Sequence, residues 1–284
     1  MHGARPKRAN ALLFIILAIY VCVRILEVVT GAPRTAIVAL EVLSALVFAF
    51  VDGAPRYGWR GILIFALIGS VISTIVESIG IATGFPFGRY QFLEIMGPTL
   101  FNVPILIGLG YIGMAYVSWM LARLILGADR SGADGSRMFA LPFLASCVMV
   151  TWDWAQDPVW STLLHAWRWR DGGAWFGVPL SNYFGWFLTV FLIYLSFALY
   201  LRRWPNENLR SRPADPWPVV VFYALCASGN ALQLLTRLPQ QTVLDASGKS
   251  WTVAGILRAS ALVSILVMGG FVLAAARRLR TNEL

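Results

Sequence analysis

Three acidic side chains in this sequence have the type and spacing that proton-transfer chemistry needs. Glu77 lies near the end of one apolar run, and Asp153 and Asp157 stand four residues apart at the end of another. An ionisable group at the centre of a bilayer costs roughly 3 kcal/mol, so such groups persist mainly where the protein uses them. Carboxyl groups exchange protons with substrates in general acid–base catalysis. The pattern therefore favours a proton-transferring site over purely structural carboxylates.

Glu77 belongs to a stripe of small and polar residues. Ser70, Ser73, Glu77, Gly80 and Gly84 recur at helical spacing, which places them on one face of a helix. We expect this face to pack against protein and not against lipid. The structural alternative for Glu77 is a buried glutamate that pairs with a neighbouring helix.

The two aspartates also have structural alternatives. Asp157 precedes Pro158, an arrangement typical of a helix N-cap followed by the first helical residue. This pattern predicts a short interfacial helix over Pro158 to Trp169 with Asp157 as its cap. Asp153 would then be a helix-end residue that reaches Arg168 or Arg170.

Aromatic residues accompany these carboxylates in two connections. Seven of the twelve tryptophans fall between Thr151 and Trp186. Tryptophan prefers the membrane interface, and aromatic faces can also line an apolar pocket or stabilise a cation. The stretch from Thr83 to Phe92 is rich in glycine and aromatic residues, and its glycine and proline breaks predict an interfacial or re-entrant loop.

Other candidate motifs favour structural roles. Arg24 and Glu27 are three residues apart and can pair on one helix face, whereas Glu41 has no partner nearby in the sequence. The glycines Gly108, Gly110 and Gly113 match a dinucleotide-binding pattern, but no strand precedes them, so we interpret them as sites of close helix packing. His165 is the only histidine beyond the start of the chain, which excludes a histidine-based metal site.

The elements that must position these residues are membrane helices. Apolar residues make up 58% of the 284 positions and charged residues 13%, which is typical of lipid-facing surface and not of a soluble globule. The chain therefore predicts an all-α, polytopic integral membrane bundle with about eight transmembrane helices and two aromatic-rich non-cytoplasmic loops. The expected spans are 11–29, 36–51, 61–80, 100–126, 138–152, 183–201, 218–235 and 253–276.

Charge sets the expected orientation. Most arginines and lysines fall at the two ends of the chain and in alternate connections, which places both termini in the cytoplasm. We expect residues 1–284 to form one transmembrane domain, with short basic cytoplasmic tails at 1–10 and 277–284. The first span is expected to anchor the chain in a bacterial or archaeal cytoplasmic membrane. The net charge of +9 is explained by lipid head groups, so no nucleic acid partner is predicted.

Two long motifs carry a resemblance to a known family. The first is Glu77-x-x-Gly80-x-x-Thr83-Gly84-x-Pro86-Phe87-Gly88-x-Tyr90, followed by Gly97-Pro98 and Asn102-Val103-Pro104. The second is Trp152-Asp153-x-x-x-Asp157-Pro158, Trp167-x-Trp169 and Phe176-Gly177-Val178-Pro179-x-x-Asn182-x-x-Gly185-Trp186. Between Glu77 and Trp186 the chain resembles membrane carotenoid biosynthesis proteins, which include hydratases acting on gamma-carotene or bisanhydrobacterioruberin. Phe92 and Phe176 stand where tyrosine is expected.

The resemblance implies hydration of the terminal isoprenoid double bond of an acyclic carotenoid end to a tertiary alcohol. Such a hydro-lyase needs no cofactor and no metal, and its partners are the carotenoid and membrane lipid. We expect Glu77 or Asp153 to donate the proton, while Asp157, Tyr90 and Asn182 position water. Six further residues are expected to bind the substrate: Trp152, Trp186, Phe87, Trp167, Trp169 and Arg89.

Two other functions fit parts of the sequence. Asp153 and Asp157 have the spacing of carboxylates that hold Mg²⁺ for a diphosphate, as in an intramembrane prenyltransferase, although a second acidic cluster is missing. A proton-coupled transporter would use buried Glu27, Glu41 and Glu77 as a relay. No inverted repeat supports that alternative.

Overall fold

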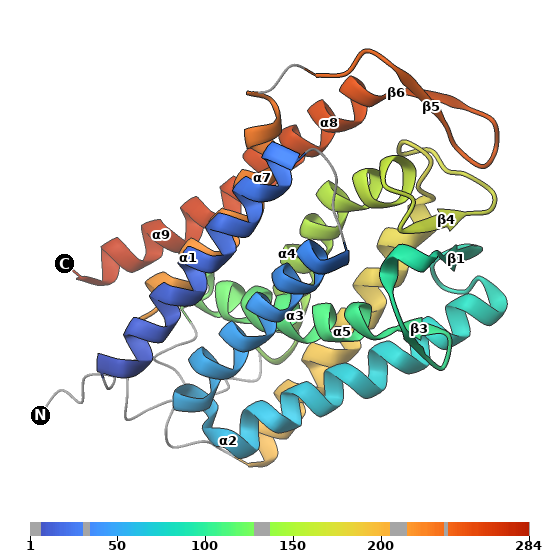
Figure 1. The fold of residues 1–284 in the computed structure, drawn as a ribbon. Coiled ribbons are helices and arrows are strands. Elements are labelled where there is room, and N and C mark those ends of the chain that lie inside the picture. Colours follow the sequence, from blue (N-terminus) through green and yellow to red (C-terminus); the bar gives the residue numbers. More distant parts are fainter. Residues whose placement is uncertain (1–6, 31–34, 128–136, 205–214, 236–237, 284) are drawn as a thin grey trace, which may run out of the picture.

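The structure is a computed structural model that describes residues 7–30, 35–127, 137–204, 215–235 and 238–283 (Figure 1). In these residues the chain forms a bundle of helices, which confirms the predicted all-α membrane fold. The helices are α1 (Lys7–Thr30), α2 (Thr35–Thr83), α3 (Ile105–Ile125), α4 (Arg137–Asp157), α5 (Leu180–Arg203), α7 (Trp217–Gln233), α8 (Val253–Leu262) and α9 (Gly269–Glu283). A π-helical turn, η2 (Pro158–Leu163), continues α4, and a second one, η3 (Val263–Met268), joins α8 to α9.

Five helices among the described residues are long and apolar enough to cross a membrane, and α1 contains a shorter apolar segment. One of the five, α2, holds two of the expected spans. The predicted number of about eight crossings stays a prediction. One predicted boundary was wrong. The span expected from residue 100 begins at Ile105, because the residues before it form a short hairpin. Helix α9 continues to Glu283, so the residues of the expected C-terminal tail up to Glu283 are helical, and their place in the cytoplasm stays a prediction.

The long helix α2 turns sharply, so its two halves run in different directions (Figure 1). Pro55 lies in the turn, and Gly58 has φ of 70°, a conformation that glycine adopts without steric cost. Helix α3 packs against both halves. A side chain at Gly113 would come within 2.8 Å of the Ala45 backbone, which confirms close helix packing there, whereas Gly108 has no neighbour within 4 Å.

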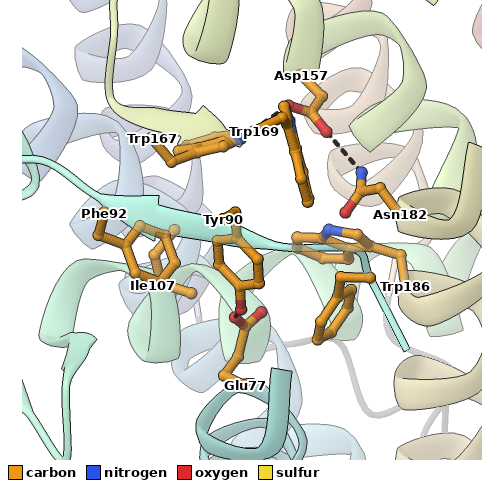
Figure 2. Close-up of a pocket in the computed structure, with 10 residues that line it drawn as sticks. Glu77, Tyr90, Phe92, Ile107, Asp157, Trp167, Trp169, Asn182 and Trp186 are labelled. Atoms are coloured by element: carbon orange, nitrogen blue, oxygen red, sulfur yellow. Dashed lines mark hydrogen bonds between the residues drawn. The ribbon is translucent and has the colours of Figure 1, made fainter. Parts of the chain in front are cut away.

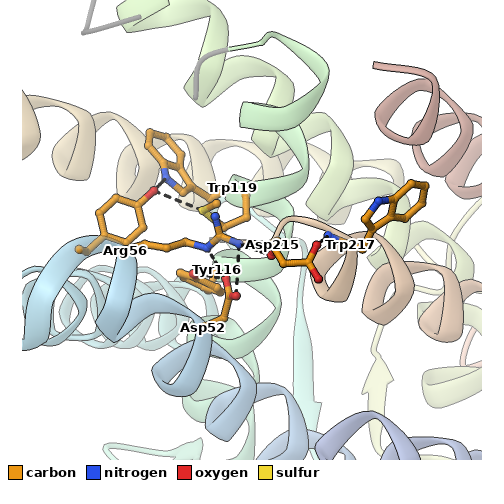
Figure 3. Close-up of polar contacts among 8 residues, drawn as sticks. Asp52, Arg56, Tyr116, Trp119, Asp215 and Trp217 are labelled. Carbon is orange, nitrogen blue, oxygen red and sulfur yellow. Dashed lines mark hydrogen bonds and ion pairs between the residues drawn. The ribbon is translucent and has the colours of Figure 1, made fainter. Parts of the chain in front are cut away.

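A polar cluster fixes this turn to its neighbours (Figure 3). The fully buried Asp52 accepts hydrogen bonds from Arg56 Nε at 2.8 Å and from the Tyr116 hydroxyl at 2.6 Å. Arg56 also donates to the backbone carbonyl of Asp215 at 2.9 Å, just before α7. The cluster therefore connects α2, α3 and the start of α7.

We expect Asp52→Ala to destabilise the protein strongly. Removing one partner of a buried ion pair leaves the other charge uncompensated, at a cost of about 3–5 kcal/mol. Thermal unfolding in detergent measures the effect. Asp171→Ala is the matched control, because Asp171 pairs with Arg89 on the exposed surface, where ion pairs contribute little. Equal melting temperatures for the two variants would contradict this prediction.

A second, partly buried ion pair connects α1 and α2. The Arg24 guanidinium lies 2.8 Å from the Glu41 carboxylate, so Glu41, which had no partner in the sequence, has one in the fold. The Glu27 side chain lies outside the described residues. A methyl group on Gly229 of α7 would fall 1.7 Å from an Arg24 nitrogen, so the Arg24 guanidinium packs directly against this glycine. Glu41 thus belongs to a different cluster from Glu77.

Short strands gather at one end of the bundle, and the start of α1 and the end of α9 lie at the opposite end (Figure 1). The strands are β1 (Tyr90–Phe92), β2 (Thr99–Leu100), β3 (Val103–Pro104), β4 (Trp167–Trp169), β5 (Thr242–Leu244) and β6 (Ser250–Thr252). They form the antiparallel pairs β1–β4, β2–β3 and β5–β6. Which end faces the cytoplasm stays a prediction.

The pairing of β1 with β4 corrects one expectation. The predicted helix from Pro158 to Trp169 ends at Leu163, and Trp167 to Trp169 form a strand opposite Tyr90 to Phe92. The physical reason is the pairing partner: the two aromatic loops satisfy each other's backbone groups, which no sequence-local pattern reveals. The two loops therefore form one two-stranded ribbon at this end of the bundle.

Candidate active site

A pocket lies beneath the β1–β4 ribbon and between α2, α3, α4 and α5 (Figure 2). Its volume, counted as the space open to the centre of a water molecule, is about 30 Å³. This is room for one or two water molecules. The residues that line it are Glu77, Phe87, Tyr90, Phe92, Ile107, Asp157, Trp167, Trp169, Asn182 and Trp186. Most of the residues expected at the site therefore meet in one place.

The Glu77 carboxylate forms one side of the pocket. It is 4% exposed, and the polar stripe of α2 faces protein as predicted. One Glu77 oxygen accepts a short hydrogen bond from the Tyr90 hydroxyl, and the other accepts one from the Tyr111 hydroxyl at 2.8 Å. Two phenol donors suit an ionised carboxylate, which is an acceptor only. Glu77 is therefore held in a fixed orientation.

Tyr111 of α3 was missed by the sequence reasoning. Its ring stacks on Trp186 with the ring centres 4.4 Å apart and the planes 10° from parallel. A tyrosine in an apolar span has a hydroxyl that needs a partner, and this signal was available in the sequence. Tyr111 thus joins the carboxylate of α2 to the aromatic side of α5.

Asp157 lies on the opposite side of the pocket (Figure 2). Its Oδ1 accepts a hydrogen bond from Trp167 Nε1 at 2.9 Å, and its Oδ2 accepts one from Asn182 Nδ2 at 2.5 Å. Asn182 also donates to Asp153 Oδ2 at 3.1 Å. One amide therefore links two buried carboxyl groups, one helical turn apart on α4.

These contacts overturn the structural alternatives for the two aspartates. Asp157 has helical backbone angles and makes no capping hydrogen bond, because α4 continues into η2 without a break. Its carboxyl group therefore points to the pocket. Asp153 accepts a hydrogen bond from Asn182. The alternative for Asp153 was a contact with Arg168 or Arg170.

Phe87 is held between two helices by glycine. A methyl group on Gly80 of α2 would come within 2.7 Å of the Phe87 ring, and one on Gly185 of α5 within 2.4 Å. Ser181 donates a hydrogen bond to the Phe87 carbonyl at 2.8 Å. The two motif glycines thus leave the space that the buried Phe87 ring occupies beside the pocket.

We expect Gly185→Ala to disturb this packing. The added methyl group overlaps the Phe87 ring, and overpacking of this kind costs about 1–3 kcal/mol. Thermal unfolding in detergent should show a lower melting temperature. Gly108→Ala is the matched control, because that helical glycine has open space around its Cα. The expectation is wrong if the two variants melt together.

Two expected substrate-binding residues do not line the pocket. Arg89 forms an ion pair with Asp171, and both side chains are more than half exposed. The guanidinium lowers the pKa of the Asp171 carboxyl group. Trp152 lies behind Trp186 and meets its ring edge-on, with the centres 6.3 Å apart. Arg89 therefore supports the loops from outside, and Trp152 supports Trp186.

Within the described residues, the side chains around Asp153 and Asp157 do not form a metal-binding site. No group of three His, Cys, Asp or Glu side chains comes together there in a way that could hold an ion. The oxygens of Asp157 instead accept hydrogen bonds from indole and amide N–H groups. The prenyltransferase alternative gains no support from this arrangement.

Comparison with known proteins completes this picture. The family described as carotenoid biosynthesis protein matches residues 34–246, well over half of the chain and all of the residues that line the pocket. A search among curated proteins and a search among solved structures each found no match. The resemblance carried by the two motifs is confirmed at the level of the family. The chain belongs to the carotenoid biosynthesis protein family.

Proposed function

We propose that this protein hydrates the terminal isoprenoid double bond of an acyclic carotenoid end to a tertiary alcohol. The proposal rests on two buried carboxyl groups, those of Glu77 and Asp157, which lie on opposite sides of an aromatic pocket. Adding water to an unactivated alkene needs a proton donor, a site that tolerates a cation, and a group that accepts a proton from the attacking water. The pocket offers side chains for all three tasks.

The sequence led us to expect Glu77 or Asp153 as the proton donor, and this proposal instead assigns that role to Asp157. Asp153 and Asp157 share the Asn182 amide, and two carboxyl groups this close hold one proton more readily than two negative charges. Of the two, only Asp157 lines the pocket. Asp157 therefore delivers the proton to the less substituted alkene carbon, and Asp153 acts through it as a positioning residue.

In this proposal, Glu77 accepts the proton that the attacking water releases. Tyr90 and Tyr111 hold both Glu77 oxygens, which keeps the carboxylate oriented toward the pocket. The tertiary cation forms between this negative charge and the faces of Tyr90, Trp169 and Trp186, where aromatic rings stabilise positive charge. Water adds to the cation, and its released proton passes to Glu77. No bound metal or redox group takes part in these proposed reaction steps.

The membrane setting suits such a substrate. The pocket lies at one end of an apolar bundle, and a carotene is about as long as a bilayer is thick, so its end group reaches this depth. With the amino terminus in the cytoplasm, as the charge pattern predicts, the reaction takes place near the opposite face. Carotenoid and lipid are thus the proposed partners.

Expression in cells that accumulate lycopene or gamma-carotene tests the proposal. Mass analysis of the pigments should show the gain of one water per modified end, with ψ-type ends converted to tertiary alcohols. An Asp157→Asn variant expressed to the same level is the control. Unchanged pigments with a folded, membrane-inserted protein would refute hydration of these carotenoids. Dependence on Mg²⁺ and a diphosphate donor would instead support prenyl transfer.

A further inference from the structure

A second cavity lies beside the pocket, under the β5–β6 hairpin. Its volume open to the centre of a water molecule is about 180 Å³, several times that of the pocket. Polar side chains line much of it, in contrast to the aromatic pocket. The lining includes Ser161, Thr162, His165, Arg168 and Asp245. Because His165 and Arg168 are exposed, this second cavity is open to the aqueous surface of the loops.

Trp169 lines both the pocket and the second cavity. Its ring packs against Tyr90 with the centres 5.0 Å apart, and its indole N–H faces Asp157 Oδ1 at 3.4 Å. Ser161, on the side of the second cavity, donates to the Asp157 carbonyl at 2.7 Å. One indole therefore separates a polar, water-accessible space from the proposed proton donor.

The proposed hydration needs a supply of water to the pocket, and the second cavity can provide it. The pocket has room for only one or two water molecules, and an alkene end group that enters it fills the aromatic space. Water that captures the cation must then arrive from a side that the apolar chain does not occupy. We propose that the second cavity is the water-binding site that supplies the capture step past Trp169. This inference rests on the proposed hydration.

Loss of this water supply has a distinct chemical signature. Asp157 transfers its proton to the alkene CH carbon, which gives a tertiary cation and an Asp157 carboxylate. If water adds, a C–O bond forms and Glu77 takes the released proton. If water does not arrive, the CH₂ group formed at that carbon rotates, its original hydrogen passes to the Asp157 carboxylate, and the alkene forms again. In D₂O the recovered alkene then carries deuterium at that carbon.

The experiment compares deuterium in recovered carotenoid with the yield of alcohol, both measured by mass spectrometry in D₂O. Ala246 is exposed and lines the second cavity, so Ala246→Trp should fill it without disturbing the bundle. We expect the ratio of exchange to hydration to rise about tenfold, equivalent to about 1.4 kcal/mol in the partition of the cation. Leu244→Trp, at a second exposed lining position, should act in the same direction.

Thr242→Trp is the matched control, because Thr242 is exposed on the same hairpin but does not line the second cavity. It should leave the ratio unchanged. An unchanged ratio in folded Ala246→Trp and Leu244→Trp proteins, with hydration intact, overturns the water-supply inference alone. A wild-type protein that neither hydrates nor exchanges overturns the proposed function as well.

Discussion

Replacing Asp157 with asparagine is expected to lower the hydration rate by about 10²–10⁴-fold, the usual contribution of a positioned general acid. Asparagine keeps the size of the side chain, and its carbonyl still accepts the hydrogen bond from Trp167. It has no acidic proton to give to the alkene. Deuterium exchange into recovered carotenoid should therefore disappear together with the alcohol, as measured by mass spectrometry in D₂O.

Asp171→Asn is the control for this substitution. Asp171 is an exposed aspartate that pairs with Arg89 outside the pocket, so its loss should change neither exchange nor hydration. A second comparison, Asp153→Asn, removes the neighbouring carboxyl group that does not line the pocket, and we expect a smaller loss. Full hydration by Asp157→Asn would remove Asp157 from the mechanism.

Replacing Glu77 with glutamine is expected to separate the two halves of the reaction. Glutamine retains one oxygen that accepts a hydrogen bond from a tyrosine, but it cannot accept a proton from water. Hydration should fall by about 10²-fold or more, as for the loss of a general base. Exchange of deuterium into the alkene should continue, because Asp157 still donates a deuteron and its carboxylate still removes the original proton from the same carbon.

Glu94→Gln controls for the loss of a carboxylate near the same loops, since Glu94 is exposed and does not line the pocket. It should behave as the wild type in both assays. The opposite pattern, with exchange lost in Glu77→Gln and kept in Asp157→Asn, would show that the donor and the acceptor have been assigned the wrong way round. Pigment mass and deuterium content distinguish the two patterns directly.

Local patterns predicted the parts of this site that lie within one helix or one loop. The stripe through Ser73 and Glu77 follows from helical spacing alone, because a polar face in an apolar span must turn toward protein. The loop after Thr83 follows from its glycine and proline breaks. The bundle itself follows from the length and hydropathy of the spans.

Contacts between distant segments were the ones that sequence reasoning missed. The Asp157-Pro158 pair is typical of a helix start, yet α4 continues through it into η2, where Asp157 meets Asn182 of α5. Tyr111 has its partner 34 residues away and Arg24 has Glu41 across a helix connection. The β1–β4 ribbon depends on pairing across about 77 residues, which no local pattern encodes.

Helix α3 is attached to α2 at two heights by tyrosine hydroxyls: Tyr111 bonds to Glu77 and, five residues on, Tyr116 bonds to Asp52. A slide of α3 by a single residue, about 1.5 Å along its axis, would break both attachments at once. The depth of the glutamate relative to the bundle is consequently set by helix register. Adaptation to a longer or bulkier end group is therefore expected from changes of the side chains that line the pocket, which need no movement of a helix.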